Sequence, residues 1–299
     1  QIHGGSVQEI MSGICEAEAA IGITLDESQR QCVFGVLTSF IPIHTITAGP
    51  GCGKTTIMEV VVHVLQGRTK LLNDPETHQT VEVPYKINFT APTGKAAKVL
   101  SARIKRFGLS AATIYKLLGV RTKDDESSGN GYFEFGPDNL LDVDLLVVDE
   151  TSMVDLALMQ ALLLAVPATA HIIFMGDKDQ LPSVGPGSVL SDFLQLPFDH
   201  HRLNQTHRND GGILDVVKQA GTGRVDLISR DDVDFHCALP EASADSIASV
   251  LAHYDRAIAV NFGDFSKVGL LIARRKGDPL SPGWNTTYLN AVLRQRYNP

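Results

Sequence analysis

The segment from Ile43 to Gln66 constrains the fold of this chain more than any other. A β-branched apolar run enters a loop with three glycines, Lys54 and two threonines, and a helical apolar run follows. Glycines let the backbone curl so that consecutive N–H groups face phosphate oxygens, and the following helix adds the positive end of its dipole. The order of strand, glycine-rich loop and helix therefore predicts a site for a nucleoside triphosphate.

The loop residues have distinct expected tasks. Lys54 is expected to reach the β- and γ-phosphates of ATP, and the Thr55 hydroxyl to ligate Mg²⁺. The strict pattern G-x-x-x-x-G-K-[ST] has glycine where this chain has Ala48, which we interpret as a variant of the same loop. The residues expected to contact the nucleotide are Gly49, Pro50, Gly51, Cys52, Gly53, Lys54, Thr55 and Thr56.

Two further apolar runs end in polar residues. Residues 145–148 contain no polar side chain, as is typical of a central parallel strand, and Asp149 and Glu150 follow. Ligands bind at the carboxyl ends of such strands, so we expect Asp149 to hold Mg²⁺ and Glu150 to orient and deprotonate the attacking water. A second buried strand, His171 to Met175, precedes Gln180, which we expect to sense the γ-phosphate at the same edge.

The rest of the chain alternates between helical and strand patterns, and its length of 299 residues allows two domains. We predict a helix within residues 1–22, a helix capped by Asp26, a strand over 86–91, and helices over 95–105 and 112–118. Residues 68–81 are polar and predict a loop. The predicted domains are an N-terminal helical segment over 1–24, a nucleotide-binding domain over 25–197 with a hairpin insertion at 124–140, and a second domain over 198–299.

The charge distribution bears on the partner. The net charge of −8 argues against nucleic acid, but residues 83–123 hold nine basic residues and no acidic one. A basic stripe on an acidic protein is typical of a groove that follows a nucleic-acid backbone, and a solvated helix face is the alternative reading. Within the stripe we single out Lys95 and Lys98.

Cysteine, histidine and hydropathy patterns limit the other classes. The four cysteines form no C-x-x-C pair, which predicts a reducing compartment, the cytoplasm, and neither disulfides nor a zinc site. His200, His201 and His207 lack metal-ligand spacing and are expected in loops. No apolar run approaches the roughly 20 residues of a membrane span, so we expect no membrane partner.

Six motifs in register resemble the RecD family of superfamily-one DNA helicases, the family of the exodeoxyribonuclease V alpha subunit. They are LDESQ, AGPGCGKTT, TAPTGKAAKVL, TIYKLLG, LLVVDETSMVD and MGDKDQLPSVGPGSVLSDFL. The resemblance implies RecA-like core domains, each a parallel α/β sheet with helices on both faces. It also implies ATP-driven movement from five-prime to three-prime on single-stranded DNA, with strand separation.

The resemblance also assigns residues. Gln29 matches the glutamine that reads adenine, as its amide suits the N6/N7 edge of that base. Gln180 matches the coupling glutamine, and Arg208 the arginine that reaches the γ-phosphate from the second domain. The implied contacts to the DNA backbone are Pro92, Thr93 and Thr113, together with Tyr115, which stands where the family has histidine.

The family continues into a segment resembling T-x-H-K-x-Q-G-x-E and a last motif with a second arginine, and neither occurs in these 299 residues. We therefore expect a helicase fragment with an incomplete second domain, or a family member reduced to nucleotide binding, with slow hydrolysis and no unwinding on its own. Three functions remain open. They are a DNA-dependent ATPase motor, a non-motor nucleotide- and DNA-binding module of a larger nuclease or conjugative complex, and a nucleotide-dependent switch that binds a protein.

Overall fold

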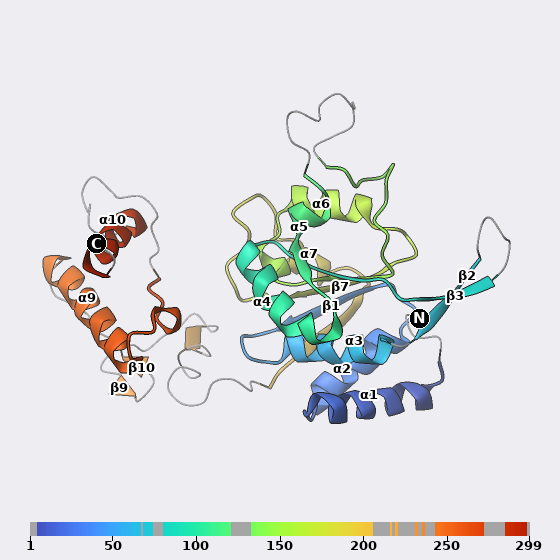
Figure 1. The fold of residues 1–299 in the computed structure, drawn as a ribbon. Helices are drawn as coiled ribbons and strands as arrows, with labels where there is room; N and C mark the ends of the chain where they lie inside the picture. Colours follow the sequence, from blue (N-terminus) through green and yellow to red (C-terminus); the bar gives the residue numbers. More distant parts are fainter. Residues whose placement is uncertain are drawn as a thin grey trace. The chain divides into compact units, whose positions relative to one another are not determined.

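The computed structural model describes residues 5–66, 68–73, 80–120, 133–205, 216, 219–220, 231–232, 235–236, 243–271 and 285–297. The chain divides into two compact units, Gln1–Asp210 and Gly211–Pro299. Each unit is shown in Figure 1. The predicted site residues, apart from Arg208, are all in the described part of the first unit.

The first unit is built on a six-stranded sheet with the strand order β5-β4-β6-β7-β1-β8, in which every neighbouring pair is parallel. The strands are β1 (Ile43–Ala48), β4 (Ile87–Ala91), β5 (Ala111–Thr113), β6 (Leu145–Val148), β7 (His171–Gly176) and β8 (Asp199–Leu203). Because all six run the same way, their carboxyl ends share one edge of the sheet.

Helices cover both faces of this sheet (Figure 1). The helices are α1 (Val7–Ile21), α2 (Glu27–Thr38), α3 (Lys54–Leu65), α4 (Gly94–Ile104), α5 (Ile114–Leu117), α6 (Leu156–Ala165) and α7 (Val189–Phe193). Buried residues of α1 to α4 form one hydrophobic core, and those of α5 to α7 contribute to a second.

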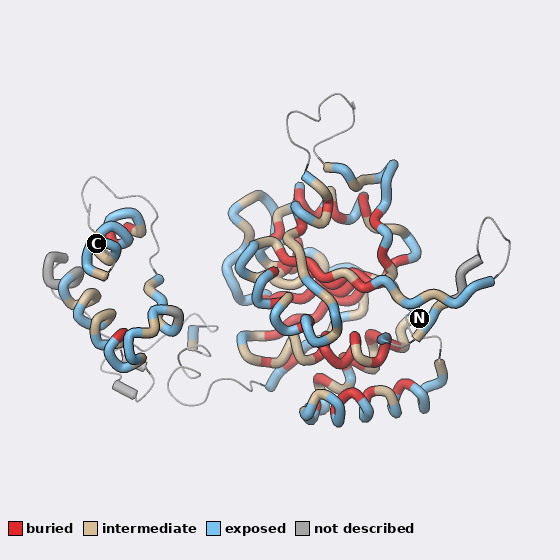
Figure 2. The backbone as a smooth tube through the Cα atoms, viewed as in Figure 1, coloured by how far each residue is buried: buried red, intermediate tan, exposed pale blue. Residues whose placement is uncertain are grey.

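Strand β6 shows how the two cores arise. Leu145 and Val147 belong to the first core, while Leu146 and Val148 belong to the second. Successive side chains of a strand point to opposite faces, so an uninterrupted apolar run serves a sheet that is covered on both sides. All four residues are buried, and buried segments run through the centre of the unit in Figure 2. The predicted parallel α/β sheet with helices on both faces is confirmed.

The prediction of a loop over 68–81 is wrong for residues 69–73 and 80–81, while residues 74–79 lie outside the described part. Strands β2 (Thr69–Asn73) and β3 (Thr80–Pro84) form an antiparallel two-stranded sheet that projects from the unit (Figure 1). Across this sheet, the Thr69 hydroxyl donates a hydrogen bond of 2.9 Å to Glu82 Oε2. Lys70 forms an ion pair with Asp144, which lies just before β6.

The predicted helix over 112–118 is shorter than expected. Residues Ala111–Thr113 form β5, which pairs with β4, and α5 covers only Ile114–Leu117. Of the predicted hairpin at 124–140, residues 124–132 lie outside the described part. Val120 and Phe133, which flank the undescribed stretch 121–132, form an isolated antiparallel bridge, and Gly136 and Asn139 form another after it.

The end of the first domain differs from the predicted position at residue 197. Strand β8 pairs in parallel with β1 and is therefore part of the first sheet. Segment 1–24 is also part of this unit, because Ile10 and Ile14 of α1 lie in the first core. His200 and His201 are in β8 and not in a loop, while His207 lies outside the described residues. Strand β8 was not predicted because its sequence, DHHRL, consists mainly of charged and polar residues.

The described part of the second unit contains β9 (Asp231–Asp232), β10 (Phe235–His236), α9 (Ser243–Val260), the 3-10 helix η4 (Phe265–Lys267) and α10 (Thr286–Tyr297). The Tyr297 ring lies 5.8 Å from that of Tyr254 and 5.2 Å from that of Phe265. Asp255 accepts hydrogen bonds from Arg296 and from the Tyr297 hydroxyl, so α9 and α10 pack together. That this unit is part of a second RecA-like domain stays a prediction. In the described portion of the chain no helix is long and apolar enough to cross a membrane.

Three histidines stack across neighbouring strands of the first sheet. His44 of β1 is fully buried, with its ring 6.4 Å from that of His171 on β7 and 5.7 Å from that of His201 on β8. The pKa of His44 is lowered to about 4, mainly by burial and also by the neighbouring His201, while Asp199 opposes the shift. Burial also lowers the pKa of His171 to about 4.

These histidines predict that the unit loses stability in acid. The pKa of an unfolded histidine is about 6.5, so between about pH 6.5 and 4 the unfolded chain binds protons that folded His44 and His171 do not bind. The free energy of unfolding should fall as the pH falls through this window, by up to ~3 kcal/mol for His44 alone. In His44→Phe, which keeps a flat ring in the stack, denaturant unfolding from pH 7.5 to 4.5 should show a smaller loss than in the wild type. Identical pH profiles would contradict the assignment.

Candidate nucleotide site

A pocket of about 520 Å³ opens at the carboxyl edge of the first sheet. It is lined by the whole loop between β1 and α3, by Asp149 and Glu150 after β6, and by Gln180 after β7. The structure therefore brings together residues that are 100 positions or more apart in the sequence. The predicted nucleotide residues that line it are Gln29, Gly49, Pro50, Gly51, Cys52, Gly53, Lys54, Thr55 and Thr56.

The loop backbone is shaped by glycines with positive φ. Gly51 has φ 80° and Gly53 has φ 83°, the left-handed region that other residues enter at a cost of ~1–2 kcal/mol. Ala48 has no positive φ and ends β1 as an ordinary buried strand residue. A glycine is therefore not required there, which explains how the loop accepts Ala48. Its carbonyl accepts a hydrogen bond of 2.7 Å from Lys54 Nζ.

The N-terminus of α3 differs from those of its neighbours. Side chains of Asp26, Thr93 and Asp155 cap α2, α4 and α6, whereas Gly53 provides no side-chain cap for α3. The first N–H groups of a helix have no partner within the helix. At α3 they are left for a group in the pocket, and the helix dipole favours an anion there.

The two acids after β6 are held in unusual environments. Glu150 adopts φ 51°, and its Oε2 is buried with no hydrogen-bond partner among the described residues. Burial raises the pKa of Glu150, and the nearby Asp149 and Asp177 raise it further against the effect of Lys54. Burial also raises the pKa of Asp149, whose Oδ1 accepts a 2.9 Å hydrogen bond from Glu150 N. A strained backbone and an unpaired buried oxygen are features of a site completed by a ligand.

The donor set fits a magnesium ion bound with a nucleotide. Thr55 offers a hydroxyl and Asp149 a carboxylate to the same pocket. Mg²⁺ usually takes one or two protein oxygens and completes its shell with phosphates and water. The described residues contain no cluster of three or more His, Cys, Asp or Glu side chains that could hold a metal ion.

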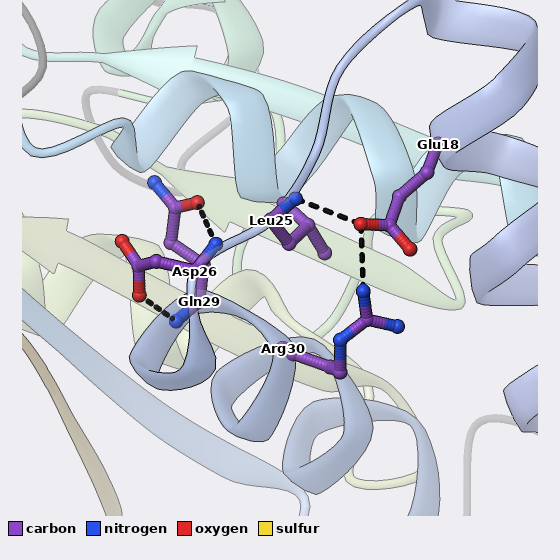
Figure 3. Close-up of polar contacts among 5 residues, drawn as sticks. All are labelled: Glu18, Leu25, Asp26, Gln29 and Arg30. Atoms are coloured by element: carbon purple, nitrogen blue, oxygen red, sulfur yellow. Dashed lines mark hydrogen bonds and ion pairs between the residues drawn. The ribbon is translucent and has the colours of Figure 1, made fainter.

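Gln29 makes contacts that the sequence reading did not anticipate. Its Oε1 accepts from Asp26 N at 3.1 Å, and Asp26 Oδ1 accepts from Gln29 N at 2.9 Å, a reciprocal capping box at the start of α2 (Figure 3). Its Nε2 donates to Cys52 O in the phosphate loop at 3.1 Å. With 3% of its surface exposed, Gln29 is a tether between α2 and the loop. Its contact with adenine stays a prediction.

A second anchor precedes this capping box. Glu18 of α1 accepts hydrogen bonds from Leu25 N at 2.7 Å and from Arg30 Nη2 at 2.8 Å (Figure 3). The connection between α1 and α2 is therefore fixed at its last residue, immediately before Asp26. The spacing D-x-x-Q was the available sequence signal for the capping box.

Five other residues line the pocket that sequence reasoning did not assign to it, namely Ile23, Thr24, Glu59, Val99 and Arg103. Glu59 was not predicted because it lies within the apolar run of α3, and Arg103 was assigned to the basic stripe. The only available signal was helical spacing, since Val99 and Arg103 are four residues apart on α4.

The predicted DNA contacts gather at the ends of β4 and β5. These strands pair so that Ala91 lies opposite Thr113. Thr93 caps α4 and Thr113 caps α5, each by accepting a hydrogen bond of 3.2 Å from a backbone N–H. Pro92 is half-buried beside them, and Tyr115 is 42% exposed.

The basic stripe is less uniform than the sequence suggested. Lys86 pairs with Asp142, Arg106 pairs with Glu59, and Arg103 lines the nucleotide pocket. Lys95 and Lys98 are exposed near the start of α4 and form no ion pair within the described part. Arg121 and Lys123 lie outside the described residues, as does Arg208.

Comparison with known proteins places the chain in a family. A model of the AAA domain family matches residues 24–235. The chain belongs to this family. Its sequence is RecD-like, as the six motifs indicated, and its sheet, loop and helices form a P-loop NTPase fold.

Three relatives illustrate the likeness. The RecBCD enzyme subunit RecD of Haemophilus influenzae is 36% identical over 182 residues, which are 54% of this chain and 26% of that protein. The RecD subunit of Mycolicibacterium smegmatis is 30% identical over 290 residues, covering 87% of this chain and 49% of that protein. The ATP-dependent RecD2 DNA helicase of Deinococcus radiodurans is 34% identical over 254 residues, covering 85% of this chain and 30% of that protein. The chain thus spans about half or less of these relatives.

Among solved structures, unliganded Pif1 from Bacteroides sp is similar with a TM-score of 0.44 and 18% identity. The match covers 87% of this chain and 61% of that chain.

The loop geometry predicts that Gly53→Ala impairs the site. A Cβ at position 53 would lie 2.4 Å from Gln29 Nε2, and the left-handed backbone would add ~1–2 kcal/mol of strain. We expect ATP affinity, measured by calorimetry, to fall at least about tenfold, since relieving the clash breaks the tether to Cys52. Gly94→Ala is the matched control, because a Cβ there meets no atom within 4 Å. Wild-type affinity in Gly53→Ala would contradict this account of the loop.

Proposed function

We propose that the chain is the nucleotide-binding core of an ATP-dependent DNA helicase that moves from five-prime to three-prime along single-stranded DNA. The observation that carries this proposal is the convergence of Lys54, Thr55, Asp149, Glu150 and Gln180 on one pocket at the carboxyl edge of a parallel sheet. The family and the RecD-like sequence support the same reading.

Each side of the pocket has a task in hydrolysis. The N–H groups of the loop and of the uncapped α3 bind the phosphates, and Lys54 leaves its loop carbonyl to contact the β- and γ-oxygens. Glu150, whose pKa is raised by burial, accepts a proton from the attacking water. Gln180 contacts the γ-phosphate and couples ATP hydrolysis to movement along DNA. Arg208 supplies positive charge to the γ-phosphate.

Magnesium is proposed at Thr55 and Asp149. The Thr55 hydroxyl and the Asp149 carboxylate would hold the ion, which would supply positive charge to neutralise the charge that develops on the phosphates. Burial raises the pKa of the Asp149 carboxyl, and a divalent cation beside it would favour the ionised form that can serve as a ligand.

Single-stranded DNA is proposed to cross the ends of β4 and β5. The helix N-termini at Thr93 and Thr113 offer backbone N–H groups to phosphates, and Lys95 and Lys98 add charge beside them. Tyr115 exposes an aromatic ring on which a base can stack. Contacts of this kind bind DNA without reading its sequence.

The physiological setting is proposed from the relatives. Two of them are named as subunits of the RecBCD enzyme, so we propose that this chain also works with other subunits of a DNA-processing complex. Cys15 and Cys32 are free thiols, which supports a reducing compartment such as the cytoplasm. A non-motor module in such a complex is the second candidate, and it is disfavoured by the intact acids and Gln180 in the pocket.

Hydrolysis that depends on single-stranded DNA tests the motor. We expect single-stranded DNA to stimulate ATP turnover by the purified protein. Glu150→Gln should lower turnover at least about 100-fold while ATP affinity changes little, because proton transfer matters in the transition state. Asp142→Asn removes a carboxylate three residues before β6 and should leave turnover unchanged. ATP binding without any stimulation by DNA would favour the non-motor module.

The DNA contacts predict a change in salt dependence. Each lost phosphate contact should reduce the slope of log affinity against log salt by ~0.7 for single strands. Replacing Lys95 and Lys98 together by Glu should therefore flatten the slope by ~1.4, measured by fluorescence anisotropy on a labelled oligonucleotide. Lys105→Glu, beyond the far end of α4, is the matched control. An unchanged slope in the double variant would mean that these lysines are only a solvated face.

A further inference from the structure

The nucleotide pocket extends beyond the phosphate loop along α3. Glu59 lines it and lies five residues after Lys54 on the same helix, a rise of about 7.5 Å. Ile23, Thr24, Val99 and Arg103 line the pocket as well, from α4 and from the connection before α2. None of the helicase motifs assigns a task to these five residues.

Glu59 is unusual because it is a carboxylate with only 8% of its surface exposed. Its Oε2 is bound by Arg106, and Arg103 also lies close enough to act on its charge. Its Oε1 makes no hydrogen bond within the described residues. This oxygen is not fully buried, and its side chain lines the pocket. The ion pair therefore holds a negatively charged acceptor in place with one oxygen left for a ligand.

The surroundings specify the chemistry of that ligand. A carboxylate accepts hydrogen bonds and donates none, so its partner must carry donors. If triphosphate binds at the loop, as the proposed function requires, the group one to two helical turns along α3 is the nucleoside. The adjacent hydroxyls of a ribose offer two donors to a carboxylate, while Ile23 and Val99 offer apolar surface to a base.

We propose that Glu59 accepts hydrogen bonds from the ribose hydroxyls of the bound nucleotide, with Arg106 as the residue that positions it. Glu59 then makes the pocket selective for ribonucleoside triphosphates. This inference rests on the proposed function and adds a specificity-determining residue to it. The burial that raises the pKa of Glu59 is opposed by Arg106 and Arg103, which favour the charged acceptor.

The test compares ATP with 2′,3′-dideoxy-ATP and with inosine triphosphate, which lacks the amino group of adenine, by calorimetry in the presence of magnesium. The wild type should bind ATP about tenfold more tightly than dideoxy-ATP, the effect of a hydrogen bond to a charged group. In Glu59→Gln this ratio should fall below about threefold, while the ratio of ATP to inosine triphosphate should not change. The wild-type comparison needs no variant and stands even if Glu59→Gln folds poorly.

The control is Asp144→Asn. Asp144 is also a partly buried, ion-paired carboxylate, but it lies at the opposite end of β6 from the pocket. The Asp144→Asn variant should be less stable in thermal unfolding, but it should still bind ATP about tenfold more tightly than dideoxy-ATP. Equal binding of ATP and dideoxy-ATP by the wild type would overturn the ribose assignment and leave the proposed function standing. A Glu59→Gln variant that loses only its discrimination between ATP and inosine triphosphate would likewise overturn the ribose assignment and leave the proposed function standing. No binding of any triphosphate would overturn both.

Discussion

The parallel direction of all six strands is the constraint on which the first unit depends. Parallel neighbours cannot be joined by a tight turn, so each connection crosses a face of the sheet and covers it. With both faces covered, polar groups are left to the strand ends. The carboxyl ends of β1, β6 and β7 then deliver the phosphate loop, the two acids and Gln180 to one place. The polar residues of the candidate site lie at this edge because both faces of the sheet are buried under helices.

The phosphate loop is supported from outside as well as by its own glycines. Glu18 fixes Leu25, the capping box fixes Asp26 and Gln29, and Gln29 holds Cys52. Four hydrogen bonds of 2.7 to 3.1 Å thus lead from α1 to the backbone that would receive phosphates. Because Gln29 is almost fully buried, a movement of the loop disturbs the start of α2. The N-terminal helix is therefore a structural part of the nucleotide site and not an appendage to it.

The sequence predicted the parts of the structure in which local pattern and burial agree. The apolar run before Asp149, the glycine loop and the helix after it each carry a strong local signal, and the structure has all three. It failed where a short polar strand is held by its neighbours, as in β8 and in the pair β2 and β3. Their pairing depends on residues far away in the sequence, such as Asp144 for Lys70.

In the candidate site too, residues within a strong local pattern were predicted, and residues held in place by distant partners were not. The loop, Asp149 and Glu150 could be placed from spacing alone, because the chemistry of phosphate binding fixes the residue types. Glu59 could not be found that way, since one acid in the apolar run of α3 has no pattern to distinguish it. Only its pairing with Arg106, across helices, shows that its charge is held at the pocket. Arg103 was misread for a related reason, because a count of basic residues does not say which face of a helix each one occupies.

Helix α4 is where the two proposed ligands come closest to sharing one element. It begins at Thr93, beside the proposed DNA contacts, and its later residues Val99 and Arg103 line the nucleotide pocket. The helix has 11 residues, about 16 Å in length, and its hydrogen-bonded backbone moves as one body. Its buried side chains Ala97, Leu100 and Ile104 hold it against the sheet. A nucleotide that shifts the Arg103 end against this packing would also shift the Thr93 end. Helix α4 therefore offers a direct connection between the proposed ATP and DNA sites in the first unit, in addition to Gln180.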